Sequence, residues 1–262
     1  MSQKIILTLF VLFVSLVCRP SAPWAEETVT MNLEPSTVNI SAFYNGTDLT
    51  ITGEVPTEAE ILVRLTGELQ DVTLKKKGKV GGMLWMNVAE VTFKNVPSVY
   101  LLYTSKALGE IATAENGAAW DGLGLGFDSI KQQMQIVSDG NDKEILYKDF
   151  MKMKKHEELY SIQPDVVQFT QNNSPMKAYS ATIHVPSQLK PGTYHIDVVA
   201  VGNDRVIADT SQELKLEQIG FPAFLSSMAF GRSLIYGILS VVIAIFAGLG
   251  MSMAFTSKGG AH

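Results

Sequence analysis

Two long apolar runs bracket a chain that otherwise alternates between hydrophobic and polar positions. The first run covers residues 5–17, and the second covers residues 234–255 without a charged side chain. About 20 apolar residues in a helix cross the roughly 30 Å hydrocarbon core of a bilayer, so the second run predicts a transmembrane helix. The first run is too short to span comfortably, follows Lys4 and precedes small residues and prolines, which is typical of an export signal.

The order of these runs predicts the organisation of the chain. We expect cleavage after Ala25, which removes a signal peptide of residues 1–25 and leaves an exported domain of residues 26–219. An uncleaved N-terminal anchor is the alternative, because Pro23 fits a cleavage site poorly. The domain is followed by an expected juxtamembrane linker at residues 220–233, a transmembrane helix at residues 234–255 and a cytoplasmic tail at residues 256–262.

Most of the exported domain has the hydrophobic patterning of β-strands. Short runs rich in β-branched and aromatic residues alternate with turn-forming residues, among them Asn45-Gly46, Gly78 and Gly81-Gly82. The expected strands are residues 28–33, 37–43, 49–54, 61–66, 72–77, 84–88, 90–94, 99–104, 161–170, 178–185, 193–201, 206–207 and 213–218. This spacing predicts a mainly β fold with immunoglobulin-like antiparallel sandwich portions, either one extended sandwich or two lobes.

Two local patterns favour a sandwich. Within residues 61–66, Leu62 and Arg64 point to one face, and the three aliphatic residues between and beside them point to the other. Residues 189–198 place a Pro-Gly turn before Thr-Tyr and alternating apolar residues, as is common where such a chain crosses between sheets. We therefore expect Tyr194 to act as a tyrosine corner, with its hydroxyl bonded to nearby backbone.

The middle of the domain changes from β to helical spacing. One stripe recurs at intervals of three and four residues, and it comprises Leu123, Phe127, Ile130, Met134 and Val137. A second stripe comprises Leu146, Phe150 and Met153. These stripes predict a helical insertion over about residues 107–159, packed beside the sandwich.

Composition narrows the classes of protein that the chain can belong to. The formal net charge is −5, which argues against a nucleic-acid binder and against broad electrostatic attachment to anionic lipid. Cys18 is the only cysteine, so cleavage of the signal leaves no disulfide, thiolate metal site or cysteine nucleophile. The fold of the mature domain must therefore rest on its hydrophobic core.

No sequence motif for catalysis is present. The chain lacks Gly-x-Ser-x-Gly, a phosphate-binding loop, His-Glu-x-x-His and paired cysteines, and we predict neither enzymatic activity nor a cofactor. The alternative is a metal-binding site for copper or zinc, because thioether and imidazole groups bind these ions. The candidate ligands are Met153, His156, His184 and His195, although a sheet-crossing corner at Tyr194 would separate the last two.

Two features are candidates for contact with a partner. The first is a basic hairpin tip with nearby aromatic and amide groups, formed by Lys75, Lys76, Lys77, Lys79, Trp85 and Asn87. Its alternative is a solvated turn whose charges protect a sheet edge. The second is a row of small residues in the transmembrane helix that lets another helix approach closely, formed by Ser240, Ala244, Ala247 and Gly248.

Several segments together resemble an uncharacterised family of putative transmembrane proteins described mainly from alphaproteobacteria. They are residues 43–46 (FYNG), 82–87 (GMLWMN), 91–100 (VTFKNVPSVY), 191–194 (PGTY) and 234–237 (LIYG). The resemblance implies a signal peptide, a periplasmic domain and one C-terminal helix in the inner membrane. It also implies a partner among sulfite-exporter-type permeases, near whose genes members are often encoded, and it carries over no catalytic residues.

These observations lead to one functional hypothesis and one alternative. We expect a non-catalytic accessory or binding protein, anchored in the inner membrane with its N-terminal domain in the periplasm, that works beside an integral membrane protein such as a permease. The alternative is a periplasmic carrier of copper or zinc.

Overall fold

The computed structural model describes residues 28–111, 125–138, 142–170, 175–202 and 205–256 of the 262-residue chain. The expected signal peptide, the expected helical residue Leu123 and nearly all of the expected cytoplasmic tail lie outside the described residues.

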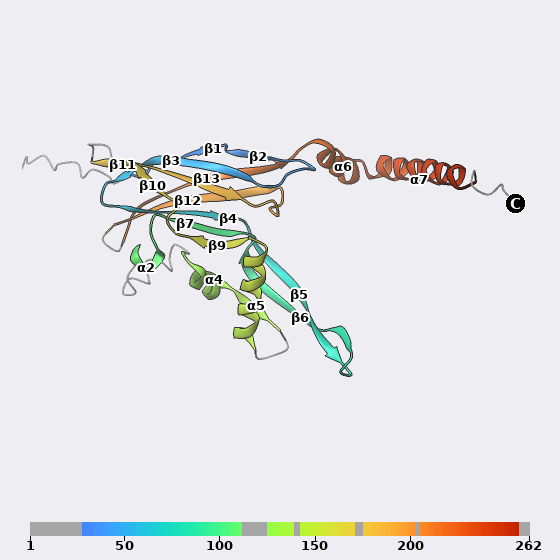
Figure 1. The fold of residues 1–262 in the computed structure, drawn as a ribbon, viewed down its shortest axis with the longest axis horizontal. Coiled ribbons are helices and arrows are strands. Elements are labelled where there is room, and N and C mark those ends of the chain that lie inside the picture. Colours follow the sequence, from blue (N-terminus) through green and yellow to red (C-terminus); the bar gives the residue numbers. More distant parts are fainter. Residues whose placement is uncertain (1–27, 112–124, 139–141, 171–174, 203–204, 257–262) are drawn as a thin grey trace, which may run out of the picture.

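The described strands form three sheets (Figure 1). Sheet A has the order β1 (Asn32–Glu34), β3 (Thr47–Pro56), β11 (Met176–Val185) and β10 (Gln168–Thr170). Sheet B has the order β2 (Thr37–Ile40), β13 (Arg205–Gln218), β12 (Gly192–Gly202), β4 (Glu60–Thr66), β7 (Tyr100–Thr104) and β9 (Tyr160–Gln163). Sheet C comprises β5 (Leu69–Val80), β6 (Leu84–Pro97) and β8 (Gln135–Val137). The described helices are α2 (Leu108–Ile111), α4 (Phe127–Gln133), α5 (Lys143–His156), α6 (Gly220–Gly231) and α7 (Ser233–Thr256).

Sheets A and B pack together around the main hydrophobic core. In β4, Ile61, Val63 and Leu65 are fully buried in this core, whereas Leu62 belongs to a second core on the opposite face of sheet B. This confirms the alternation expected for residues 61–66. Because β3 pairs with β11, and β4 pairs with β12, strands from both halves of the sequence share each sheet. The two expected β portions therefore form a single sandwich rather than two lobes.

The second core covers the other face of sheet B, where α4, α5 and the root of the β5–β6 hairpin pack. Phe150 of α5 stacks on Phe93 of β6 with ring centroids 4.4 Å apart, and its ring meets Tyr160 edge-on at 6.2 Å. The Tyr160 hydroxyl donates a 2.6 Å hydrogen bond to the carbonyl of Pro97, at the end of β6. Sheet B is thus the central layer of the domain, and the helical layer holds the hairpin root against it.

Part of the expected helical insertion is a strand. Helix α4 ends at Gln133, and the Met134 N–H bonds to the Ile130 carbonyl at its C-terminus, with Met134 in an extended conformation. Residues 135–137 then form β8, which pairs with β6. The prediction of a helix through Met134 and Val137 was wrong. The edge of β6 offers hydrogen-bonding partners to the backbone of these residues, which the local periodicity does not reveal.

Several expected strands have different limits in the structure. Gly78, expected in a turn, lies within β5 opposite Met86, and the reversal falls at Gly81-Gly82. The expected strand at residues 161–170 divides into β9 in sheet B and β10 in sheet A, with Asp165 at a φ of +60° between them. Residues 206–207 and 213–218 belong to one strand, β13.

The tyrosine corner is confirmed. The Tyr194 hydroxyl donates a 2.8 Å hydrogen bond to the carbonyl of Lys190, four residues earlier, at the point where the chain passes from β11 in sheet A to β12 in sheet B. The mainly β fold and the C-terminal apolar helix are therefore as expected, and the immunoglobulin-like topology stays a prediction.

Candidate functional site

The β5–β6 hairpin is the element of the domain that projects furthest from the sandwich (Figure 1). Its root is buried, since Val91, Phe93 and Val96 belong to the second core. Beyond Leu74 and Val91 the two strands continue to Val80 and Leu84 with only each other as hydrogen-bonded neighbours. A two-stranded ribbon of this kind is marginal in water alone, so the packed root has to support the projecting part.

The reversal at the end of the hairpin depends on two glycines. Gly81 and Gly82 have φ values of +62° and +79°, in the left-handed region that costs a side-chain-bearing residue energy. A Cβ at either position would meet no atom within 4 Å, so backbone conformation and not crowding requires glycine. The sequence expectation of a turn at Gly81-Gly82 is confirmed.

The hairpin presents two chemically different faces. Directly opposite residues in paired strands share a face, so Lys77 with Asn87 and Lys79 with Trp85 form one side of the ribbon. Val80 with Leu84 and Gly78 with Met86 form the other side, where Val88 also covers Gly78. A β-bulge between Lys76 and Lys77 separates this arrangement from the stem. The end of the hairpin is therefore cationic and aromatic on one face and apolar on the other.

The charge of the hairpin is locally one-sided although the protein is acidic. Residues 74–89 contain four lysines and no aspartate or glutamate. Among the described residues, none of these lysines forms an ion pair with a carboxylate. The amine of Lys79 lies 5.5 Å from the centre of the Trp85 ring, within the range of a cation–π contact. The basic surface predicted at a hairpin tip therefore lies along β5, before the turn at Gly81-Gly82, and its first lysine, Lys75, is directly opposite Glu90.

Helix α7 carries the second predicted contact surface. Ser240, Ala244, Ala247 and Gly248 are spaced by four, three and one residues, which places them along one side of the helix. The Ser240 hydroxyl donates a 2.8 Å hydrogen bond to the Tyr236 carbonyl, so this polar group needs no partner in lipid. A Cβ on Gly248 would touch nothing within 4 Å, and the helix surface there is free for close approach.

The structure does not bring the four candidate metal ligands together. His184 lies on β11 in sheet A, and its Nδ1 is 2.7 Å from Oδ1 of Asp48. His195 lies on β12 in sheet B, while Met153 and His156 belong to α5. No group of three or more His, Cys, Asp or Glu side chains able to hold a metal occurs within the described residues.

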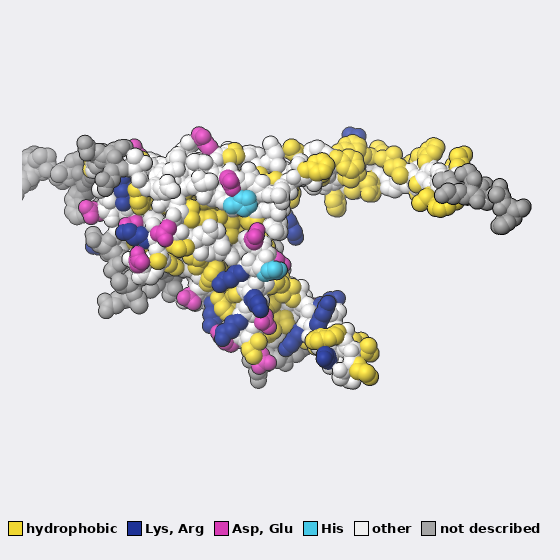
Figure 2. Space-filling model, in the orientation of Figure 1, with side chains coloured by type: hydrophobic (Ala, Val, Ile, Leu, Met, Phe, Trp, Pro, Cys, Tyr) yellow, Lys and Arg dark blue, Asp and Glu magenta, His cyan; other side chains and the backbone are white. Residues whose placement is uncertain are grey.

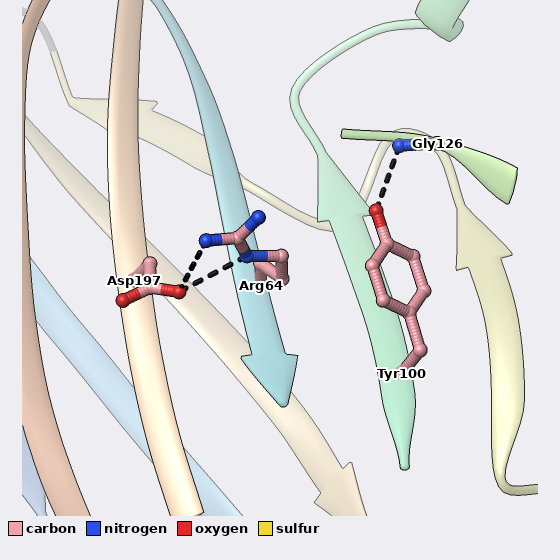
Figure 3. A network of polar contacts seen from close by, with 4 residues as sticks. All are labelled: Arg64, Tyr100, Gly126 and Asp197. Atoms are coloured by element: carbon pink, nitrogen blue, oxygen red, sulfur yellow. Dashed lines mark hydrogen bonds and ion pairs between the residues drawn. The ribbon is translucent and has the colours of Figure 1, made fainter. Parts of the chain in front are cut away.

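A pair of polar contacts on the helical side of sheet B was not expected from the sequence (Figure 3). Arg64 of β4 donates to Asp197 of β12 through Nε and Nη2, at 3.0 and 2.7 Å. Next to β4, the Tyr100 hydroxyl of β7 accepts a 2.7 Å hydrogen bond from the N–H of Gly126, just before α4. Burial raises the pKa of Tyr100 to about 12. The Arg64–Asp197 contact joins two strands, and the Tyr100–Gly126 contact attaches the start of α4 to the sheet. The sequence alone could not reveal the first contact, because it depends on the non-local pairing of β4 with β12.

An open groove of about 550 Å³ lies beside the hairpin root. Its lining includes Glu68, Ser98, Lys154, Glu157 and the turn at residues 188–194. Lys154 is almost completely buried, its amine lies 3.6 Å from a carboxylate oxygen of Glu157, and it sits 5.8 Å from the Phe150 ring centre. Both contacts of the lysine amine are with residues of α5 or its C-cap, so its charge is paired within the helix.

The fold and these surfaces define a class: a single-pass membrane protein with a mainly β domain and one projecting hairpin. Within the described residues, the segment Ser233–Met253 of α7 is long and apolar enough to cross a membrane, and none of it is buried by the domain. The chain belongs to the family described as putative transmembrane protein (Alph_Pro_TM), whose profile matches residues 28–257. The expected resemblance is confirmed. A comparison with curated proteins finds no match.

Proposed function

We propose that this protein is a non-catalytic accessory subunit of an integral membrane protein, with α7 in the inner membrane and the β domain in the periplasm. A permease of the sulfite-exporter type is the partner that the family resemblance implies. The observation that carries the proposal is the β5–β6 hairpin, which projects from the sandwich toward the end of the molecule where α6 and α7 lie (Figure 1). An exposed cationic projection at the membrane is suited to contact with a neighbouring membrane protein.

The stem lysines, Lys75 and Lys76, supply charge for that contact. They are exposed and lie between the packed root of β5 and the bulge after Lys76. Complementary charge at such a surface guides association and orients partners. We assign them to acidic loops on the outer face of the partner. The root packed under α5 supports this role, because an interaction surface held by a rigid layer loses less conformational freedom on binding.

Helix α7 supplies the second contact. Without a hydrophobic driving force between helices in lipid, close packing over small residues and interhelical contacts favour association. The row of Ser240, Ala244, Ala247 and Gly248 offers such a surface along α7. Once α7 has bound the partner, the hairpin is held near its own site on the same partner. The second contact then forms at a high effective concentration, which strengthens the overall binding.

The use of the buried polar groups supports a role without catalysis. Arg64 pairs with Asp197, Lys154 pairs with Glu157, and the Tyr160 hydroxyl bonds to backbone. Catalytic groups are more typically gathered in a cleft with a nucleophile near a base. Here Arg64 connects β4 to β12, Tyr160 connects β9 to the end of β6, and Lys154 is paired within α5 and its C-cap.

Co-purification from native membranes in mild detergent tests the partnership. We expect Ala244→Leu, which fills the small-residue surface, to reduce partner recovery at least about tenfold, since central contacts dominate interface energy. Reversal of the stem lysines to glutamate should act in the same direction. The matched controls are Val242→Leu on another side of α7, and glutamate at the exposed Lys143 and Lys148 of α5. Recovery of the protein alone, with all variants unchanged, would refute the proposal.

Reporter fusions test the proposed orientation. Two reporters are used, one that is active only after export and one that is active only in the cytoplasm. Joined after Gln218, at the end of β13, only the export-dependent reporter should be active. Joined after residue 256, only the cytoplasmic reporter should be active, because α7 stops transfer across the membrane. Cytoplasmic activity of the first fusion would contradict the periplasmic placement of the domain.

A further inference from the structure

The end of the hairpin exposes large apolar side chains that no part of the described domain covers. Met83 is 86% exposed, Leu84 and Trp85 are each 66% exposed, and Met86 is 52% exposed. We call residues 79–86 the hairpin tip. Clustered exposed apolar groups mark interaction or membrane-contact surfaces, and a long free ribbon that ends in them would promote aggregation in water.

The tip lies at the level where the chain enters the membrane. Figure 1 shows the hairpin tip level with α6 along the long axis of the molecule, and α7 running onward from α6 along that axis. Figure 2 shows hydrophobic side chains gathered both at the tip and over α6. Phe221, Phe224 and Phe230 of α6 are at least half exposed. A bilayer that contains α7 therefore has its outer surface at α6 and within reach of the tip.

A third element reaches the same level. The N–H of Ile219, directly before α6, bonds to the carbonyl of Ile40 at the end of β2. The following β2–β3 loop starts beside α6 and carries Phe43, which is 94% exposed. Three apolar projections from separate parts of the chain thus lie at the end of the domain from which α7 departs.

The residue types at the tip match the interface of a bilayer. Tryptophan settles at the level of the headgroups, and a lysine beside it extends its amine toward phosphate. Lys79 lies over Trp85, and the absence of acidic residues from positions 74–89 leaves the local charge complementary to anionic headgroups. The opposite face, with Val80, Leu84 and Met86, offers the apolar surface that the acyl boundary accommodates.

We infer that the hairpin tip inserts into the outer leaflet of the same bilayer that holds α7, with Lys77 and Lys79 at anionic lipid phosphates. The inference rests on the proposed periplasmic placement of the domain and does not require the proposed partner. Two points of attachment, α7 and the tip, fix the tilt of the sandwich on the membrane. The stem lysines then stand just above the lipid surface, at the height of a neighbouring protein's outer loops.

The test uses the full chain in vesicles without other proteins. Cys18 is the only native cysteine, so a Cys18→Ser background accepts a single fluorophore at Met83→Cys. The control label is at Glu58→Cys, in the exposed turn between β3 and β4 at the other end of the strands. Vesicles contain phosphatidylcholine alone or with about a third phosphatidylglycerol, an anionic lipid. Quenchers are lipid-borne doxyl groups and aqueous iodide.

We expect doxyl quenching at Met83→Cys to exceed that at Glu58→Cys at least about threefold in anionic vesicles, with protection from iodide. Adding Lys77→Glu and Lys79→Glu should lower the doxyl quenching at least about threefold, because each lysine contributes to attraction by anionic lipid. Lys94→Glu, on the hairpin outside the tip, should leave it unchanged.

Three other outcomes are distinguishable. Equal iodide quenching at both labels in pure lipid overturns the inference. Protection of the Met83→Cys label from iodide in native membranes, but not in pure lipid, also overturns the inference. That result would show that the tip contacts a protein and not lipid. Insertion in pure lipid, together with recovery of the protein alone from native membranes, supports the inference and refutes the accessory-subunit proposal.

Discussion

Replacing Phe150 by alanine is expected to lower the free energy of unfolding by about 3–5 kcal/mol, the usual loss for a buried aromatic residue. Phe150 is only 1% exposed, and its ring packs between Phe93 of β6 and Tyr160 of β9. Alanine would remove both ring contacts and leave a cavity between three elements. Equilibrium urea unfolding of the full chain in mild detergent, followed by circular dichroism, measures the change.

The control for this prediction is Ile145→Ala on the same helix. Ile145 is 58% exposed, so its truncation should change the free energy of unfolding by less than about 0.5 kcal/mol. If the two variants lose equal stability, α5 does not pack on sheet B as the structure has it.

The consequence of Phe150→Ala extends to the hairpin. The root residues Val91 and Phe93 are buried in the second core together with Phe150, and β8 pairs with β6 at the same level. A weakened helical layer should therefore expose the hairpin root to proteolysis before the sandwich unfolds, since segments with fewer buried contacts open at lower free energy. The helical layer therefore supports the hairpin that carries the proposed contact surfaces.

The sequence predicted the elements whose signals are local. The apolar run at residues 234–255 corresponds to α7, the Gly81-Gly82 turn ends the hairpin, and Tyr194 bonds to backbone four residues away. Each of these depends on residues close together in the chain, where spacing and turn chemistry are informative.

The features that the sequence did not predict depend on distant partners. Residues 135–137 form a strand because β6 lies beside them, and Arg64 meets Asp197 across 133 residues of sequence. Gly78 was expected in a turn because glycine is common there, but the paired strand continues through it. The two-faced hairpin tip likewise follows from the register of β5 with β6 and from the bulge after Lys76.

Gly53 provides the second large expected effect. It lies in β3 beside the chain that leads into β1, where the Thr30 N–H bonds to the Glu54 carbonyl at 3.1 Å. The Tyr179 hydroxyl donates a 2.7 Å hydrogen bond to the Thr30 carbonyl across the same position. A Cβ on Gly53 would overlap the Thr30 carbonyl oxygen and approach the Tyr179 hydroxyl to 2.8 Å.

Gly53→Ala should therefore lower the free energy of unfolding by about 1–3 kcal/mol, because the backbone of Thr30 has to move away from β3 and both hydrogen bonds weaken. Urea unfolding of the full chain measures the loss, and faster proteolysis near Thr30 would locate it. The matched control is Gly109→Ala in α2, where a Cβ meets nothing within 4 Å and alanine favours the helix. Equal stability of the two variants would show that β3 accepts a side chain at Gly53, and that the backbone of Thr30 does not lie as close to β3 as the structure has it.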